Sequence, residues 1–171
     1  MGYAVYDTDS EAKRLIATDT AVREALIRLL GEETYSPDGT YQTAYVASQV
    51  FQDKQLLAAL NGIVHPAVRR DVELWAARET MRTHRPVFLE SAILFESGFD
   101  SLCHRIVLIT APEEIRLSRV MRRDQTDIDK VRARIHAQMN DTELSRRADL
   151  TIVNDGSQTI EQLCQYITLH L

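Results

Sequence analysis

The stretch Tyr3-Ala4-Val5-Tyr6-Asp7-Thr8-Asp9-Ser10 joins a short β-type run to two closely spaced carboxylates, and an apolar-periodic helical segment follows at once. Ser10 or Asp9 is suited to cap that helix. In α/β enzymes such junctions hold working groups, because ligands bind at the carboxyl ends of parallel strands. The stretch therefore predicts an α/β fold with a functional site at the end of its first strand.

Further strands are expected later in the chain. Val87-Phe88-Leu89 and Ile106-Val107-Leu108-Ile109 are apolar runs short enough to be strands buried on both faces, as in a parallel sheet under helices. Leu150-Thr151-Ile152-Val153 is the last, and a closing helix follows it. Strands that alternate with helices at this spacing imply an α/β layered fold.

Between the first two strands the pattern is helical throughout. Ser36-Pro37-Asp38-Gly39 is a turn by composition. Pro66 suits the first turn of a helix, where its missing N–H costs nothing. The expected helices run over residues 19–30, 42–51, 54–62 and 66–83. With no linker or repeat in sight, we predict a single domain, 1–171, with an all-helical insertion at 19–83.

Composition limits the classes of partner. The net charge of −5 argues against a non-specific nucleic-acid binder, because such proteins carry a positive excess. No apolar run reaches the roughly 18 residues that span a membrane, and no signal-peptide pattern opens the chain. Cys103 and Cys164 lack metal-ligand spacing and favour reduced thiols. We expect a cytoplasmic protein.

Asp7 and Asp9 are the first chemical candidates. A hydroxyl held at this edge of the sheet can meet either carboxylate, and phosphoryl transfer needs an acid to orient and deprotonate the attacking hydroxyl. The alternative is purely local: Asp9 caps the helix and Asp7 forms the turn.

Arginines form the second candidate group. Arg116, Arg119 and Arg123 fall three and four residues apart, on one helix face. The segment from Arg116 to Arg134 holds six arginines and one lysine, a focused positive field suited to polyphosphate. The alternative is a solvated, salt-bridged face.

Three other positions are less specific. His65 precedes a proline and alone is a capping or packing group. Glu96 ends an apolar loop and either reaches the same crevice or caps the next segment. Gly156, in Asn154-Asp155-Gly156, provides the positive-φ turn after the last strand.

Taken in order, these segments resemble the dephospho-coenzyme A kinase family over nearly the whole chain. The turn Tyr6-Asp7-Thr8-Asp9 is similar to the family's DAD turn, Ile63-Val64-His65-Pro66 to its LHP signature, and Ala92-Ile93-Leu94-Phe95-Glu96 to PLLFE, with Ala92 in place of proline. The other matching segments are Ser36–Thr40, Arg119–Asp124, Ala137-Gln138 and Ala148-Asp149 leading into Asn154–Ser157.

The resemblance implies a P-loop kinase type of three-layer fold, with a parallel sheet, a helical substrate domain and a lid at 116–138. It implies phosphorylation of the 3′-hydroxyl of dephospho-coenzyme A by ATP, with Mg²⁺ bridging the phosphates. Asp9 would be the base or the acid that orients the hydroxyl, with Asp7 its neighbour near the metal, and which of the two is the base stays open. The substrate-side residues would be His65, Arg69 and Glu96. Phosphate and ATP contacts would come from Arg119, Arg122, Arg123 and Asn154, the last bordering the adenine.

One departure from the family is serious. The 171 residues contain no G-x-x-x-x-G-K-[ST], which the family carries on a strand and loop upstream of the DAD turn. Without that central first strand, its neighbours would face a gap with unpaired backbone groups. Without the loop, the phosphates lose their N–H cradle and lysine. We expect little kinase activity from this polypeptide.

Three alternatives remain open on the sequence. The chain is another nucleotide kinase, or it binds coenzyme A or dephospho-coenzyme A without turnover, or it is a fragment that begins at an internal methionine. The His65-Pro66 signature favours the coenzyme A branch over other nucleotide kinases.

Overall fold

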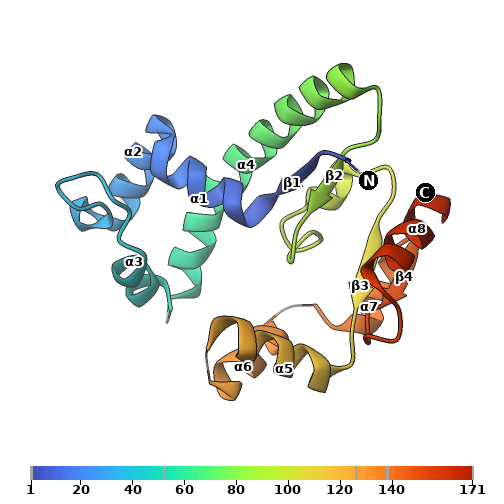
Figure 1. Cartoon of the computed structure of the whole chain (residues 1–171). Helices are drawn as coiled ribbons and strands as arrows, with labels where there is room; N and C mark the ends of the chain where they lie inside the picture. Colours follow the sequence, from blue (N-terminus) through green and yellow to red (C-terminus); the bar gives the residue numbers. More distant parts are fainter. Residues whose placement is uncertain (1, 52, 126, 138, 171) are drawn as a thin grey trace. The chain divides into compact units, whose positions relative to one another are not determined.

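The computed structural model describes residues 2–51, 53–125, 127–137 and 139–170 (Figure 1). The chain divides into two compact units, one up to Phe99 and one from Asp100 onward. Each unit contains one pair of parallel strands. Gln138, the last residue of the expected lid, lies outside the described residues.

The first unit is mainly helical. Its strands are β1 (Val5–Asp7) and β2 (Phe88–Glu90), paired in parallel with Val5 opposite Phe88 and Asp7 opposite Glu90. Its helices are α1 (Thr8–Thr18), α2 (Thr20–Leu30), α3 (Thr43–Val50) and α4 (Lys54–Thr83), with a short 3₁₀ turn at Glu32–Thr34 and the start of another at Phe99–Leu102.

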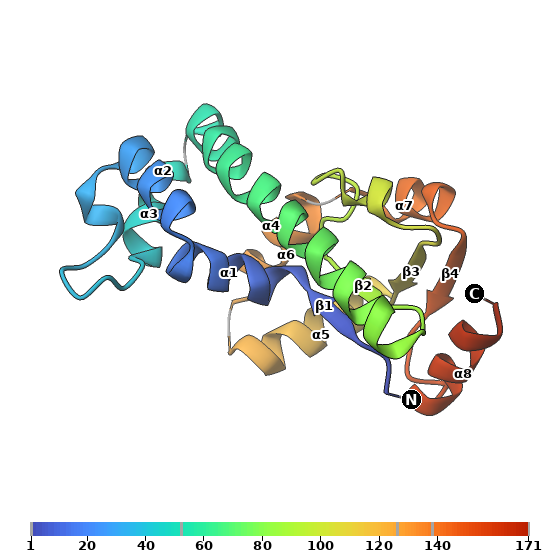
Figure 2. The same cartoon turned by 90° about the horizontal axis from the view of Figure 1, so that it is seen from above.

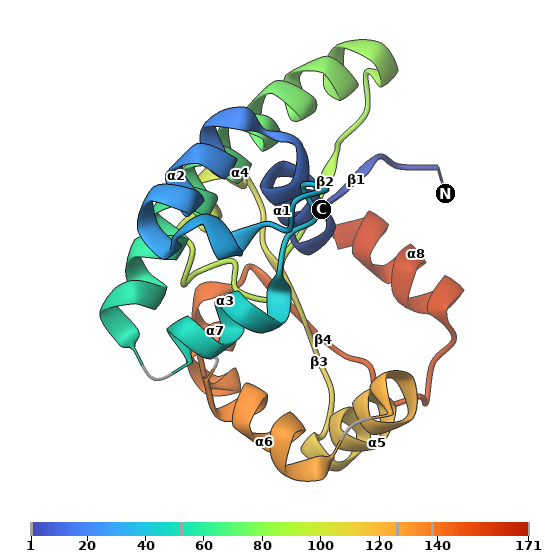
Figure 3. The same ribbon diagram turned by 90° about the vertical axis from the view of Figure 1, so that its left-hand side faces the viewer.

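The long helix α4 is the central support of this unit, and α1, α2 and α3 all pack against it (Figures 2 and 3). Its buried side chains are Val64, Ala67, Val68 and Val72. From the other helices, Leu15, Val22, Leu26 and Val46 are buried. The predicted helical segment between the first two strands is therefore confirmed.

Two local predictions in this unit are wrong. Helices at 54–62 and 66–83 were expected, but α4 is continuous and contains Pro66 in its interior. The buried residues that follow the proline hold the chain helical despite one lost backbone hydrogen bond. Neither Asp9 nor Ser10 caps α1; the cap is Asp7, because the helix begins at Thr8, directly after the strand.

The second unit contains β3 (Val107–Thr110) and β4 (Leu150–Val153), which pair in parallel from Val107 opposite Leu150 to Thr110 opposite Val153 (Figure 3). Its helices are α5 (Glu113–Asp124), α6 (Ile128–Ala137), α7 (Asp141–Arg147) and α8 (Ile160–His170). Leu117, Val131, Ile152 and Leu163 are buried.

The strands are parallel, as predicted, but burial on both faces is not observed. Ile109 is 58% exposed and Val5 is also 58% exposed. The described strands form two separate pairs, β1 with β2 and β3 with β4, instead of one continuous sheet. Each strand therefore has a single bonded neighbour, which leaves apolar side chains such as Ile109 uncovered.

Two predicted turns are confirmed. The turn at Ser36–Gly39 closes with a hydrogen bond from the Gly39 N–H to the Ser36 carbonyl oxygen at 2.8 Å. Gly156 has φ 93°, in the region that favours glycine. In the described part of the chain, no helix is long and apolar enough to cross a membrane.

Candidate active site

The carboxyl end of the β1–β2 pair gathers three acidic residues. Asp7 and Glu90 end neighbouring parallel strands and stand opposite each other in register. Asp7 is the N-cap of α1: its Oδ1 accepts hydrogen bonds from the N–H groups of Asp9 at 3.0 Å and Ser10 at 3.2 Å. Its Oδ2 accepts from Ser10 Oγ at 2.7 Å. The Asp7 carboxylate is therefore held in one orientation by its own helix.

Asp9 differs from Asp7 in that no described residue holds its carboxylate in one orientation. It lies in the first turn of α1, and its side chain is exposed. Among the described residues, no hydrogen bond or ion pair engages the Asp9 carboxylate. Asp9 thus offers an accessible acceptor beside an immobilised one.

Glu90 is a residue that the sequence reasoning missed. Partial desolvation of its carboxyl, followed by the negative charges of Asp7 and Asp9, raises its pKa above the ordinary value. The Asp7 pKa shifts the other way, mainly because the Ser10 hydroxyl and N–H donate to it. The feature of the sequence that could have indicated Glu90 is its position. It directly follows the apolar pair Phe88-Leu89, at the carboxyl end of a strand parallel to β1.

His65 and Arg69 occupy one face of α4 and contact the loop that follows β2. The His65 ring meets the buried Phe99 ring edge-on, with 6.0 Å between centroids. Arg69 Nη1 donates to the Gly98 carbonyl oxygen at 3.3 Å, and its Nε pairs with Glu73 at 3.3 Å. Burial lowers the His65 pKa, so this imidazole is neutral at pH 7.

The loop itself, residues 91–98, is a series of turns and not an extended segment. The Ser97 N–H and hydroxyl both donate to the Ile93 carbonyl oxygen, at 2.9 and 2.7 Å. Glu96 is exposed on this loop. The structure therefore brings His65, Arg69 and the Glu96 loop together within the first unit, with the loop fixed from α4.

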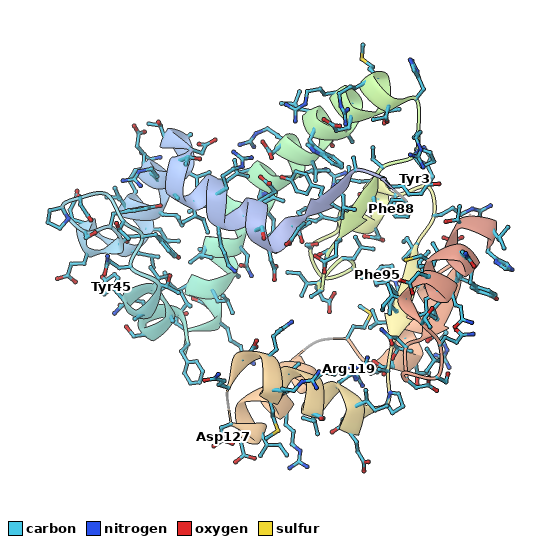
Figure 4. The ribbon with its side chains drawn as sticks, in the orientation of Figure 1. Tyr3, Tyr45, Phe88, Phe95, Arg119 and Asp127 are labelled. Atoms are coloured by element: carbon cyan, nitrogen blue, oxygen red, sulfur yellow. The ribbon has the colours of Figure 1, made fainter. Side chains whose placement is uncertain are left out.

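In the second unit, Arg119 of α5, which is labelled in Figure 4, is bound to the turn after β4. Its Nη1 donates to the Asn154 carbonyl oxygen at 2.9 Å, and its Nη2 to Asn154 Oδ1 at 3.3 Å. The Asn154 N–H donates to the Thr110 carbonyl oxygen at 2.7 Å. Two predicted nucleotide-side residues thus hold each other. Gly156 is favoured in this turn by its φ of 93° and not by a close approach, since a Cβ there would be in ordinary contact, 3.9 Å from Arg119 Nη2.

Two more arginines of α5 are paired with acids. Arg116 makes a bidentate pair with Asp141: Nη1 donates to Oδ1 at 3.2 Å and Nη2 donates to Oδ2 at 3.0 Å. Thr110 Oγ1 donates to the same Asp141 carboxylate at 3.1 Å. Arg123 pairs with its neighbour Asp124 at 2.6 Å. The charge of these arginines is partly neutralised within the unit.

Arg122 differs from these arginines in its surroundings. It lines two open clefts beside α5, of about 380 and 650 Å³. The smaller cleft also contains Arg119 and Asp155, and the larger extends to α6 at Ile128 and Arg132. Within the described ranges, no hydrogen bond or ion pair involves the Arg122 guanidinium. Of Arg119, Arg122 and Arg123, Arg122 lines both clefts and has no bonded partner among the described residues.

A protein-built metal cage is not part of this arrangement. In the part of the chain that the structure describes, no group of three or more His, Cys, Asp or Glu side chains is arranged to hold a metal ion. Mg²⁺ at phosphoryl-transfer sites is usually held by one or two carboxylates together with the substrate phosphates. The exposed carboxylates at this end of the β1–β2 pair match that donor set.

Comparison with known proteins identifies the family. A family model described as dephospho-CoA kinase matches residues 1–159. The chain belongs to the dephospho-CoA kinase family. It is 36% identical over 160 residues to a dephospho-CoA kinase of Bacteroides fragilis, covering 94% of this chain and 77% of the relative. It is 38% identical over 158 residues to one of Salinibacter ruber, covering 91% and 78%.

Solved structures agree with this family fold. A crystal structure of a Thermus thermophilus protein is similar with a TM-score of 0.80 and 35% identity, covering 99% of this chain and 85% of that one. A dephospho-CoA kinase from Campylobacter jejuni, 21% identical, has a TM-score of 0.67 and covers 98% and 84%. The fold is thus the α/β fold of the P-loop kinases. Dephospho-CoA kinases are transferases, with ATP and dephospho-CoA as their substrates.

Proposed function

We propose that this protein transfers the γ-phosphoryl group of ATP to the 3′-hydroxyl of the dephospho-CoA ribose in the cytoplasm, giving coenzyme A in the last step of its biosynthesis. Family membership supports the reaction. The observation that supports this location of the chemistry is the group of carboxylates at the carboxyl end of the β1–β2 pair.

In this proposal Asp9 is the base that orients and deprotonates the acceptor hydroxyl. Its carboxylate is exposed and free of partners among the described residues, whereas Asp7 already accepts three hydrogen bonds. A general base must come within hydrogen-bond reach of the proton that it removes. Asp7 then orients the first turn of α1 in which Asp9 lies, and Glu90 adds negative charge beside it.

His65, Arg69 and Glu96 are proposed to contact the coenzyme side of the substrate. Their support is proximity: His65 and Arg69 face the loop that carries Glu96, and this loop begins directly after β2. A neutral His65 can accept or donate a hydrogen bond without bringing a charge. This face of α4 therefore binds the part of the substrate next to the reacting ribose.

On the nucleotide side, Arg122 is proposed as the main phosphate contact, with Arg119 and Arg123 assisting it. The guanidinium of Arg122 faces two clefts, and a planar guanidinium binds phosphate oxygens through two parallel hydrogen bonds. Arg119 and Asn154, bound to each other, border the adenine end. Closure of the segment 116–138 over ATP would exclude water as a rival acceptor.

Mg²⁺ is proposed to enter with ATP as part of the co-substrate. It supplies positive charge that offsets the charge developing on the phosphate oxygens. The residues of this chain act on the 3′-hydroxyl of the acceptor. They orient this hydroxyl, receive its proton at an Asp9 carboxylate oxygen, and exclude water.

The 171-residue polypeptide itself is proposed to have little kinase activity, because it contains no G-x-x-x-x-G-K-[ST].

Calorimetry and a coupled assay test the proposal together. The polypeptide should bind dephospho-CoA, and it should release no coenzyme A above background with Mg²⁺ and ATP. Extension ahead of residue 1 by a strand and a G-x-x-x-x-G-K-[ST] loop should restore turnover with dephospho-CoA and not with AMP or CMP. Robust turnover by the 171 residues alone would refute the proposed role of the loop, and absence of dephospho-CoA binding would refute the acceptor site.

A further inference from the structure

A buried tyrosine, an arginine and an aspartate lie directly beneath the turn that carries Asp7 and Asp9. Tyr6 is 2% exposed, and its hydroxyl donates to Asp71 Oδ2 at 2.7 Å. Arg14 Nη2 donates to the same oxygen at 2.6 Å, while Arg14 Nε pairs with Glu11. One carboxylate oxygen of α4 therefore receives hydrogen bonds from two other elements.

These two elements are the ones that join at the carboxylate turn. Tyr6 lies in β1 immediately before Asp7, and Arg14 lies in α1, beyond Asp9. Because side chains alternate along a strand, Tyr6 points to the side opposite Asp7. The Tyr6 ring also packs edge-on against Trp75 of α4, with 5.2 Å between centroids. The strand before the turn and the helix after it are thus fixed to the same short section of α4.

We infer that Tyr6, Arg14 and Asp71 are positioning residues for phosphoryl transfer, which fix the angle between β1 and α1 and thereby aim the Asp9 carboxylate at the acceptor hydroxyl. The inference rests on the proposed function of Asp9. No atom of the three contacts substrate; they act through the backbone of the turn.

We call Tyr6, Arg14 and Asp71 the anchor. Their protonation states keep its hydrogen bonds intact at neutral pH. Burial, followed by the hydrogen bond to Asp71, raises the Tyr6 pKa, so the phenol stays a neutral donor. Burial acts to raise the Asp71 pKa, but the hydrogen bonds from Tyr6 and Arg14 outweigh it and hold that pKa below the ordinary value. The Asp71 carboxylate is therefore ionised, and accepts both bonds, throughout the neutral range.

The anchor also connects the acceptor carboxylates to the proposed coenzyme face. Asp71 follows Arg69 by two residues and His65 by six on the same helix. At 1.5 Å per residue these positions are about 3 and 9 Å apart along the axis. A shift of α1 relative to α4 would change the distance between the base and the bound substrate, as a small misplacement of a catalytic group does in other enzymes.

The test uses Tyr6→Phe, which removes only the hydroxyl, and Tyr35→Phe as the matched control. Tyr35 is also buried, at 7% exposed, and its hydroxyl donates at 2.8 Å to the Ile16 carbonyl oxygen, at the other end of α1. Tyr6→Phe removes a hydrogen bond between β1 and α4, and Tyr35→Phe removes one to the backbone of α1. Neither substitution changes the charge. Asp71→Asn is a second variant that keeps the shape of the acceptor.

Two readouts separate positioning from stability, both taken below the melting temperature of every variant. The first is the Asp7 pKa in the ligand-free chain, measured by carboxyl ¹³C NMR. The second is the ratio of the dissociation constants for 3′-deoxy-dephospho-CoA and dephospho-CoA, measured by calorimetry. The ratio reports the hydrogen bond to the acceptor hydroxyl, and for a charged acceptor it should be about tenfold or more in the unsubstituted chain.

In Tyr6→Phe the Asp7 pKa should rise toward the ordinary aspartate value, because the cap loosens, and the ratio should fall to within about threefold. Asp71→Asn should lower the ratio equally, and Tyr35→Phe should change neither readout. Equal readouts in Tyr6→Phe and Tyr35→Phe would overturn the positioning role. A ratio near one in the unsubstituted chain would instead overturn the assignment of Asp9 to the acceptor site, and the Asp7 titration would still decide the positioning role.

Discussion

The carboxylates after β1 and the arginines of α5 differ in how their charges are compensated within their own units. Asp9 is exposed and unpaired among the described residues, and Asp7 accepts hydrogen bonds from Asp9 and Ser10 of its own helix and has a side-chain hydrogen bond with Glu90. Arg116 and Arg119, in contrast, are bound to Asp141 and Asn154. Spacing along a helix shows which side chains share a face. Only their neighbours decide which of them remain available to a ligand.

The sharpest test of this comparison separates Asp9 from Asp7 in a version extended by a G-x-x-x-x-G-K-[ST] loop. Asp9→Asn should lower kcat by about 10²- to 10⁴-fold, the scale of a lost general base, with little change in the melting temperature. Asp7→Asn should mainly lower the free energy of unfolding, by about 0.3 to 1 kcal/mol, because asparagine caps a helix nearly as well but loses the charge that is favourable at a helix N-terminus. Rate assays and urea unfolding of both variants provide the measurements. A larger loss of kcat in Asp7→Asn would reverse the two roles.

The next test concerns the arginines in the same extended version. Arg122→Ala should lower kcat/KM by an amount equivalent to about 2 to 4 kcal/mol, the scale of one preorganised charge donor. Arg123→Ala should lower kcat/KM by less, because this side chain is exposed and already paired with Asp124. Steady-state kinetics with varied ATP checks both. Equal losses would show that pairing in the free chain does not predict which arginine meets phosphate.

The smallest effect is expected at Glu90, through pH. Its folded pKa is raised above the ordinary value of 4.5, so the folded chain binds more protons than the unfolded chain between these two pKa values. Stability linked to Glu90 is therefore fully present at low pH and is lost as pH rises through the folded pKa. Glu90→Gln should raise the melting temperature at pH 7 and change it less at pH 4.

The control is Glu24→Gln, which removes the same charge from a side chain 62% exposed on α2. Both changes in the free energy of unfolding are expected to be small, within about 0.5 kcal/mol, as for most surface substitutions. If Glu90→Gln lowers the melting temperature at pH 7 by more than the control does, the carboxylates are not in repulsive proximity.

Much of the architecture follows from local patterns. The helical segment from residue 19 to 83, the turn at Ser36–Gly39 and the strand from Leu150 to Val153 each carry a strong period or turn signal, and each is observed. The pairing of strands distant in sequence depends on which surfaces meet. The exposure of Ile109 was therefore not predictable from its apolar neighbours.

Some residues of the candidate site were likewise predictable from a local sequence pattern, and others were not. Asp7 and Asp9 are visible because two carboxylates directly follow a strand. Glu90 is not, because one acid after Phe88-Leu89 gains meaning only when β2 lies beside β1. Asp71 gives even less signal: it is one acid on a charged helix, and its two donors come from residues 57 and 65 positions away. Side-chain partners of this kind are set by tertiary packing, which no local pattern encodes.

Pro66, in the interior of α4, has a consequence for how the first unit opens. Without its N–H, the helix lacks the backbone bond to the Gly62 carbonyl oxygen, so one turn is held by side-chain packing in place of the hydrogen-bond ladder. The residues before it can then exchange their amide hydrogens in a different cooperative unit from those after it. Fraying that starts near α3 would stop at this point, and the section that carries Asp71 would remain folded.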